Sequence, residues 1–283
     1  MKKILFPTDF SPAANHAFIY ALHLADVLSA EITTLHAYPL PEIHGVVMPN
    51  LVGEIEQSIR MEEFDEYRNS VDQLRVIAEA NSLGHVRVNH TLKTGSTIKA
   101  ILASAESEGS DVIIMGTKGA TGLREVFVGS VTGEIMEKAN CPVLAIPDEA
   151  SFDHNIDRLV VTTDFTDEDE KALIEVLKFA SLFDKTQVVC LHVSPEVDEE
   201  KKMRFENMKV KFRDHHNLHF EILSHSEIFR TLGEYLEKER IDIVTMLTHK
   251  RNFFKELFKY SRAKRMIYHS KIPVLAIPAH LLK

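Results

Sequence analysis

The residues best suited to chemistry lie in a glycine-rich stretch, residues 116–130, which reads Gly-Thr-Lys-Gly-Ala-Thr-Gly-Leu-Arg-Glu-Val-Phe-Val-Gly-Ser. It directly follows the apolar run Asp111-Val-Ile-Ile-Met115 and ends at Ser130, where we expect a helix to begin. Glycine lets a backbone approach a ligand closely, because no Cβ intrudes, and the first N–H groups of a helix attract anions. This pattern therefore predicts a phosphate or nucleotide site.

A later stretch, residues 247–261, corresponds to this one but has lost its glycines. Leu247, Lys250 and Tyr260 stand at the three matching positions. A tyrosine obstructs close backbone approach and disfavours a positive φ. We therefore expect one nucleotide site, in the first half of the chain, although Asp164 persists in the second half at the position of Asp9.

The whole chain consists of two copies of one unit. We place the first domain at residues 1–148 and the second at 156–283, joined by the short polar linker Asp148–Asn155. The pairs of matching segments are Ile4–Ser11 with Leu159–Thr166, Leu35–Ala37 with Leu191–Val193, Ser110–Met115 with Ile241–Met246, and Cys141–Pro147 with Ile272–Pro278.

Short apolar runs alternate with longer stretches of helical spacing in each copy, which is typical of βα units around a parallel sheet. Ser11, Ser96 and Thr166 are expected to cap helices, the last with Asp169 at capping-box spacing. The predicted fold class is α/β: two tandem Rossmann-like, doubly wound domains, each with a five-stranded parallel sheet. The expected strands are residues 4–6, 31–37, 86–92, 112–115, 142–146 and 187–193, and the expected helices are 13–29, 51–80, 98–106, 130–139 and 171–183.

Doubly wound sheets bind ligands at the carboxyl ends of the strands where the winding direction reverses. If the first and fourth strands flank that reversal, Thr8, Asp9 and Gly116 face one crevice. Two distant parts of the sequence would then form one site.

Composition argues against nucleic-acid binding and against a membrane-spanning helix. The 283 residues include 33 basic and 42 acidic side chains, a net charge of −9, and most of the excess lies in the first half. This charge argues against nonspecific binding to nucleic acid. No run approaches the ~20 apolar residues of a membrane-spanning helix. The two cysteines, Cys141 and Cys190, lie in separate apolar runs and fit a reducing cytoplasm.

The chain resembles the universal stress protein family in its tandem form. The resemblance rests on the opening strand with Pro7-Thr-Asp9, on Leu35-His36, on the closing strand Pro142–Pro147, and on the spacing Gly-x2-Gly-x9-Gly-Ser that begins at Gly116. It implies binding of an adenine nucleotide, ATP, with Mg²⁺ accompanying the triphosphate, and a regulatory role in the stress response.

The resemblance also implies roles for single residues. Asp9 would hydrogen-bond the ribose or help to place the metal, and the backbone at Ala37 would read the adenine edge. Glycines would admit the ribose and phosphates, and the N-terminus of the following helix would hold the outer phosphates. The implied nucleotide-binding residues are Pro7, Thr8, Asp9, Ala37, Met115, Gly116, Gly119, Gly129, Ser130 and Val131.

In the family, the Pro-Val-Leu-Ala-Ile-Pro strand pairs across a dimer axis. Here residues 143–146 and 274–277 would pair within one chain and form an intramolecular pseudo-dimer, which would satisfy two open sheet edges. Such a chain could remain a monomer or form a homodimer of pseudo-dimers. The sequence identifies no protein partner.

Two alternative functions stay open. Slow ATP hydrolysis would need a base, for which Asp9 is the one candidate, and no nucleophile–base–acid set is legible from spacing. A nucleotide-free interaction module would use the basic, aromatic-rich stretch 249–265. His215, His216 and His219 lack an arrangement of ligand spacing, so we expect no metal centre there, and His36 and His192 are expected to be packed core histidines.

Overall fold

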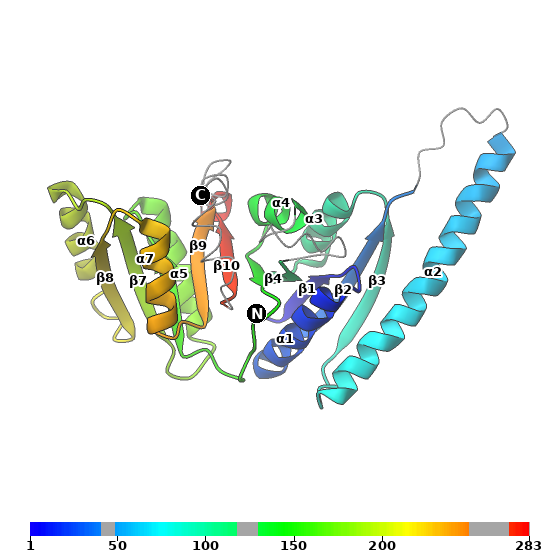
Figure 1. Cartoon of the computed structure of the whole chain (residues 1–283), viewed down its shortest axis with the longest axis horizontal. Helices are drawn as coiled ribbons and strands as arrows, with labels where there is room; N and C mark the ends of the chain where they lie inside the picture. The colour runs from blue at the N-terminus through cyan, green and yellow to red at the C-terminus, as the bar shows by residue number, and fades with distance from the viewer. Residues whose placement is uncertain (41–48, 118–129, 249–271, 283) are drawn as a thin grey trace.

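The structure is a computed structural model that describes residues 1–40, 49–117, 130–248 and 272–282. Gly119, Gly129 and the basic stretch 249–265 lie outside the described residues. Strands and helices alternate through both halves, as the spacing of apolar residues predicts (Figure 1).

In the first half, the elements in chain order are β1 (Lys3–Pro7), α1 (Pro12–Leu28), β2 (Glu31–Tyr38), α2 (Pro49–Ala80), β3 (Val88–Thr94), α3 (Thr97–Glu108), β4 (Val112–Gly116), α4 (Ser130–Lys138) and β5 (Val143–Ile146). In the second half they are β6 (Arg158–Thr162), α5 (Asp167–Ala180), β7 (Gln187–Ser194), α6 (Glu199–Lys211), β8 (Leu218–Ser224), α7 (Ile228–Lys238), β9 (Ile243–Thr248), β10 (Val274–Pro278) and the 3₁₀ turn η1 (Ala279–Leu282).

One ten-stranded sheet runs through the described residues, in the order β3-β2-β1-β4-β5-β10-β9-β6-β7-β8. Neighbouring strands are parallel within each half. The halves join where β5 and β10 pair antiparallel, with Leu144 opposite Leu275. The predicted pairing inside one chain is therefore observed, and the winding reverses between β1 and β4, as expected.

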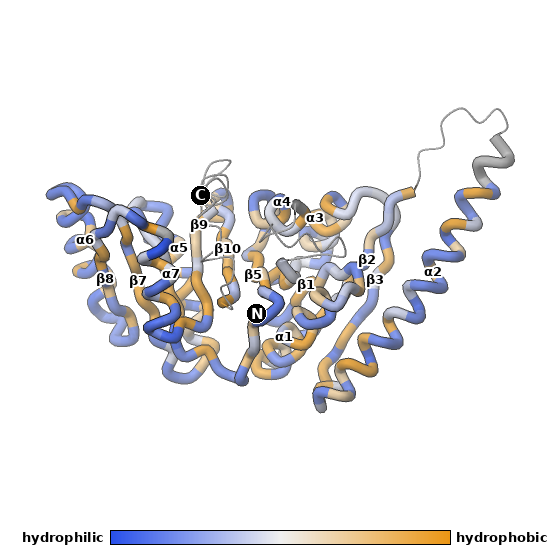
Figure 2. Tube along the Cα trace, viewed as in Figure 1, coloured by the Kyte–Doolittle hydropathy of each residue, from blue (hydrophilic) through white to orange (hydrophobic). Residues whose placement is uncertain are grey.

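Both faces of the sheet are covered, and both cores cross the boundary between the halves. One core joins α1 and α2 to α5 and α6. The other joins α3 and α4 to α7. Figure 2 shows the apolar residues along the strands and on the inward faces of the helices. The two copies are thus one hydrophobic body, because burial of their apolar surface is shared.

Local capping explains where the helices begin. The Ser11 side chain accepts a hydrogen bond from the Ala14 N–H, as predicted. Thr166 and Asp169 form the predicted capping box, so α5 begins at Asp167, earlier than the expected range 171–183. The prediction for Ser96 is wrong in part, since it occupies the N-cap position of α3 but its side chain makes no capping hydrogen bond.

Each copy fastens the start of its first strand with one aspartate. Asp111 Oδ2 accepts the N–H groups of Lys2 at 2.6 Å and Lys3 at 2.9 Å. Asp242 Oδ2 accepts those of Asp157 at 2.8 Å and Arg158 at 2.9 Å. This shared contact explains why an aspartate recurs immediately before the fourth strand of each copy.

The segment between β5 and β6 packs against α1 instead of forming a free polar linker. His16 Nε2 lies 2.6 Å from the Ala150 carbonyl oxygen. The ring centroids of His23 and His154 are 4.6 Å apart, at an interplanar angle of 90°. The sequence did not reveal this packing because the segment consists mostly of polar residues.

We predict that the two halves stay together after the backbone between them is cut. A protease site introduced at Ser151, which is exposed, should yield fragments that co-elute at the mass of the intact chain, because the β5–β10 ladder and both cores remain. Adding Leu275→Asp should separate them, since a buried unpaired carboxylate costs several kcal/mol, about 3–5 by analogy with broken buried pairs. Size-exclusion chromatography with light scattering measures whether the two fragments co-elute. Separation of the fragments in the cleaved protein without Leu275→Asp would contradict the pairing of β5 with β10.

We also predict that His23 makes stability depend on pH. Burial, and then the neighbouring His154, lower the pKa of His23 from its ordinary 6.5, while Asp26 opposes them. A lowered histidine pKa stabilises the fold above pH 6.5, and this contribution is lost as the pH falls further. The free energy of unfolding should therefore decline less steeply below pH 6.5 in His23→Gln than in the parent, measured with denaturant. His216→Gln, at an exposed position, is the control for replacing a histidine by glutamine.

Candidate functional site

A tight turn follows β1 and presents Asp9. The Thr8 N–H donates to the Leu35 carbonyl at 2.9 Å, and Thr8 Oγ1 accepts the Phe10 N–H at 3.0 Å. Asp9 Oδ1 accepts the Ser11 N–H at 3.1 Å. Phe10 has a φ of 56°, a left-handed conformation that is uncommon for a bulky residue. The turn is therefore held by several contacts, and its carboxylate lies at an exposed position.

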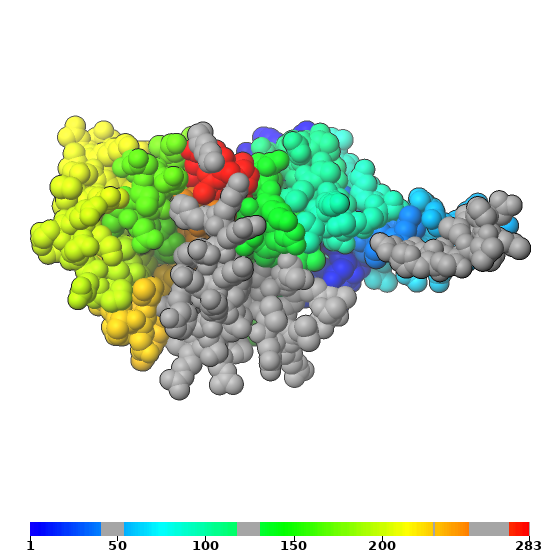
Figure 3. All heavy atoms as spheres, turned by 90° about the horizontal axis from the view of Figure 1, so that it is seen from above, coloured from blue at the N-terminus to red at the C-terminus, as the bar shows by residue number. Residues whose placement is uncertain are grey.

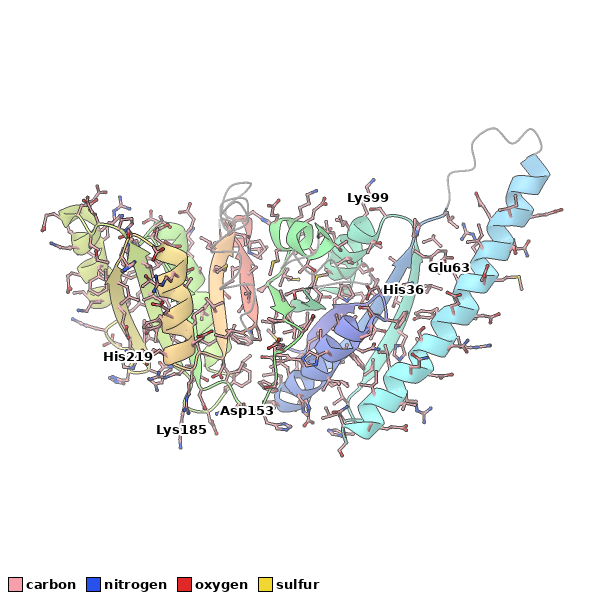
Figure 4. The ribbon with its side chains drawn as sticks, viewed as in Figure 1. His36, Glu63, Lys99, Asp153, Lys185 and His219 are labelled. Carbon is pink, nitrogen blue, oxygen red and sulfur yellow. The ribbon has the colours of Figure 1, made fainter. Side chains whose placement is uncertain are left out.

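His36, on β2, holds the same turn from the neighbouring strand. Its Nδ1 lies 2.8 Å from the Thr8 carbonyl oxygen, which can only accept, so Nδ1 is the donor of this hydrogen bond. The Phe10 ring lies 5.0 Å from the imidazole, centroid to centroid. The prediction of a core histidine misses this contact, and His36 is only partly buried. Figure 4 shows His36 between the sheet and α2.

The second half reproduces this turn in detail. Thr163 Oγ1 accepts the Phe165 N–H at 2.8 Å, and Phe165 has a φ of 61°. His192 Nδ1 lies 2.7 Å from the Thr163 carbonyl oxygen, and the histidine is buried, with 1% exposed. The second half keeps this turn although it lacks the glycines, so the turn has a structural role in the fold. It does not by itself mark a nucleotide site.

The two aspartates of the turns nevertheless differ in what holds them. In the second half, Asp169 Oδ2 accepts the N–H groups of both Asp164 and Thr166, each at 2.9 Å. In the first half, alanine stands at the position that matches Asp169, and Asp9 itself bonds the turn's N–H at Ser11. The Asp9 carboxylate is therefore anchored at the carboxyl edge of the sheet.

The end of β4 lies beside this turn. The pairing of β1 with β4 covers Ile4 and Leu5 only, although β1 continues to Pro7 and β4 to Gly116. Pro7 has no N–H to donate, which favours the end of the ladder there. The two strands thus separate towards their carboxyl ends, at the reversal of winding where ligands bind in such sheets.

The start of α4 is tied to the end of β4. Thr132, in the first turn of this helix, donates from Oγ1 to the Gly116 carbonyl at 3.0 Å. This contact brings Ser130 and Val131 to the same edge as Gly116. Figure 3 looks onto this edge and shows α4 (green) next to the C-terminal residues (red).

The structure therefore gathers most of the predicted site residues. Pro7, Thr8 and Asp9 come from the end of β1, and Ala37 comes from β2, which pairs with β1 up to Pro7. The side chains at Pro7, Thr8 and Met115 are buried, so these residues offer mainly backbone groups. The described members of the set are Pro7, Thr8, Asp9, Ala37, Met115, Gly116, Ser130 and Val131; Gly119 and Gly129 lie outside the described residues.

Tyr67 is a neighbour of the site that no sequence motif indicates. Tyr67, on α2, has a buried hydroxyl for which the described residues offer no hydrogen-bond partner, and burial raises its pKa. Its ring lies 6.1 Å from Phe10 and 6.4 Å from His36, between centroids. Phe205 takes the matching place against Phe165 in the second half, at 5.7 Å. Helical periodicity could have predicted that Tyr67 lies on the inner face of α2. It could not have predicted that Tyr67 packs beside the turn after β1.

The described ranges offer neither a candidate metal centre nor a candidate membrane-spanning helix. They contain no group of three histidine, cysteine or acidic side chains that could hold a metal ion. His219 instead contacts Gln187 Oε1 at 2.9 Å. None of the helices described has the length and apolar character that a membrane crossing requires.

Comparison with known proteins agrees with the duplication. The model of the universal stress protein family matches residues 1–147 and again residues 155–278. Universal stress protein MJ0577 of Methanocaldococcus jannaschii is 33% identical over 155 residues, covering 51% of this chain and 94% of that protein. A universal stress protein of Thermus aquaticus is 32% identical over 147 residues, covering 51% and 98%. Each relative is thus about as long as one half.

A solved structure shares the fold of the whole chain. The crystal structure of a universal stress protein from Archaeoglobus fulgidus covers 98% of this chain and 96% of its own, with a TM-score of 0.69 and 18% identity. A putative universal stress protein from Pseudomonas aeruginosa covers 100% and 95%, with a TM-score of 0.59 and 15% identity. With the family model matching both halves, the chain belongs to the universal stress protein family and carries two of its domains.

Proposed function

We propose that the first half binds an adenosine nucleotide, ATP with Mg²⁺, and that the protein acts as a nucleotide-responsive regulator in the stress response. The observation that carries this proposal is that β1, which is followed by Asp9, and β4, which ends at Gly116, are neighbours whose ladder ends before their carboxyl ends. The buried, unpaired Cys141 and Cys190 support the cytoplasm as the place where it acts.

The chemistry of the donors fits this ligand. Asp9 offers an anchored carboxylate for ribose hydroxyls, and the backbone at Ala37 offers an amide edge for the adenine. At Gly116 there is no Cβ to keep a ribose or phosphate away from the backbone. The N–H groups at Ser130 and Val131 begin α4, where the helix dipole favours the negative charge of phosphates. Gly119 and Gly129, which lie outside the described residues, belong to the same proposed set.

Mg²⁺ is compatible with so small a set of protein oxygens. This ion keeps several water molecules and is commonly held by substrate phosphates together with one or two carboxylates. Asp9 can supply one carboxylate. Magnesium would therefore come with the triphosphate and would need no separate protein site.

Binding is favoured over hydrolysis as the activity. An efficient hydrolase needs a positioned water and a base, and Asp9 is the candidate base. Its Oδ1 already accepts the Ser11 N–H, so this oxygen is engaged in holding the turn. We therefore propose that the bound nucleotide controls an interaction of the protein and is turned over slowly at most.

We predict that one nucleotide binds per chain. Isothermal titration of nucleotide-free protein with ATP and Mg²⁺ should give micromolar affinity, about −8 kcal/mol, at a stoichiometry of one. Asp9→Asn should weaken binding while the fold is retained, because the turn can keep a side-chain oxygen acceptor. A stoichiometry of two would show that the second half also binds. Absence of binding, in protein checked for copurified nucleotide, would remove the proposal.

We predict that Gly116 is one reason why the first half binds nucleotide and the second does not. Gly116→Leu introduces leucine, which the second half carries as Leu247 at the equivalent strand position. Nucleotide affinity should fall at least tenfold, about 1.4 kcal/mol, because the new side chain blocks close approach. Gly84→Ala, at an exposed glycine after α2, should bind like the parent. Equal affinity of Gly116→Leu and the parent would place the site elsewhere.

A further inference from the structure

One hydrogen bond between the halves reaches the helix that begins at the proposed site. Thr248 ends β9 in the second half, and its side chain is buried, with 4% exposed. Its Oγ1 lies 3.2 Å from the carbonyl oxygen of Met136, in α4 of the first half. The same hydroxyl is 3.4 Å from the carbonyl oxygen of Ile277 on β10. The shorter contact crosses the boundary.

The Met136 carbonyl needs a partner from outside its helix. α4 ends at Lys138, so Met136 belongs to the last four residues, whose carbonyl groups have no N–H ahead of them in the helix. Water cannot easily serve here, because the side chains of Ile135 and Met136 are fully buried. The Thr248 hydroxyl therefore satisfies an acceptor that would otherwise be buried without a partner.

The other end of α4 is fastened to the first half. Thr132 donates to the Gly116 carbonyl at 3.0 Å, and Ser130 and Val131 precede it. A helix of nine residues is about 13 Å long and moves as a unit. Besides its packing in the core shared with α3 and α7, this helix is held by one bond beside the proposed phosphate site and by one bond from the second half.

The threonine itself is held firmly. Thr248 pairs with Pro278 at the end of the β9–β10 ladder, and β10 pairs in turn with β5. At the edge seen in Figure 3, α4 lies against the C-terminal residues of the second half. His280 Nε2, in η1, also lies 3.4 Å from Asn140 Oδ1, just beyond α4.

We propose that Thr248 is a positioning residue for the nucleotide site of the other half. It would hold the C-terminal turn of α4, and so the direction in which the N–H groups at Ser130 and Val131 point. This inference rests on the proposed function of the first half. On this proposal, the second half, which lacks the glycines, contributes to the nucleotide affinity of the first half without binding a ligand itself.

Thr248→Val tests this role, because it keeps the shape of the side chain and removes the donor. Thr248→Ser keeps the donor. The matched control is Thr245→Val on the same strand, since Thr245 is buried, with 1% exposed, and its Oγ1 has no hydrogen-bond partner in the described part of the chain. Each full-length variant is titrated with ATP and Mg²⁺ at a temperature where its thermal unfolding curve shows it to be folded.

We expect Thr248→Val to raise the Kd for Mg·ATP by five- to tenfold, with Thr248→Ser within about twofold of the parent and Thr245→Val unchanged. Parent-like affinity in a folded Thr248→Val would overturn the proposal. Equal losses in Thr248→Val and Thr245→Val would also overturn it, because they would reveal general damage to the core instead of a specific bond.

Amide hydrogen exchange without nucleotide separates this inference from the proposed function. If Thr248 holds α4, residues 134–139 should exchange faster in Thr248→Val than in Thr245→Val. If the parent binds no nucleotide and Thr248→Val still shows the faster exchange, the nucleotide site is refuted and the bond's hold on α4 is established. Unchanged exchange would show that the bond does not hold the helix, whatever the parent binds.

Discussion

The structure depends above all on the short antiparallel ladder between β5 and β10. Without it, each half would expose the backbone groups of a strand edge, which invites association with other chains. The ladder is short, with Leu144 opposite Leu275 at its centre, so its stability comes mainly from the two cores that continue across it. Because the ladder fixes the second half beside α4, it also fixes the surroundings of the proposed nucleotide site.

The two copies distinguish what the fold requires from what a ligand requires. Both keep a threonine, an aspartate and a left-handed phenylalanine after the first strand, and both keep a histidine that bonds the turn. These contacts hold the carboxyl end of that strand whether or not a nucleotide binds. Gly116 and Leu247 occupy equivalent strand positions, paired with Ile146 and Ile277, so the sheet accepts either residue there.

Much of the fold could be predicted from the sequence, because its signals are local or periodic. The repeat, the alternation of strands and helices, the capping box at Thr166 and the reversal between the first and fourth strands were all legible. What could not be predicted depends on contacts between distant residues. The packing of the 148–155 segment on α1, the bond from His36 to Thr8 and the place of Tyr67 beside Phe10 are of this kind.

The same reasoning explains why the site is only partly legible from motifs. A motif indicates residues for ligand contact, as proposed for Asp9 and Gly116, because their types are constrained by the chemistry of contact. It does not give the residues that orient these, since any donor with suitable geometry can satisfy a helix carbonyl. If Thr248 favours the arrangement of α4 that binds nucleotide, linkage requires the nucleotide to stabilise that contact by the same free energy. Nucleotide binding in the first half would then strengthen the hydrogen bond between Thr248 and Met136, and so affect the second half, although neither residue contacts the ligand.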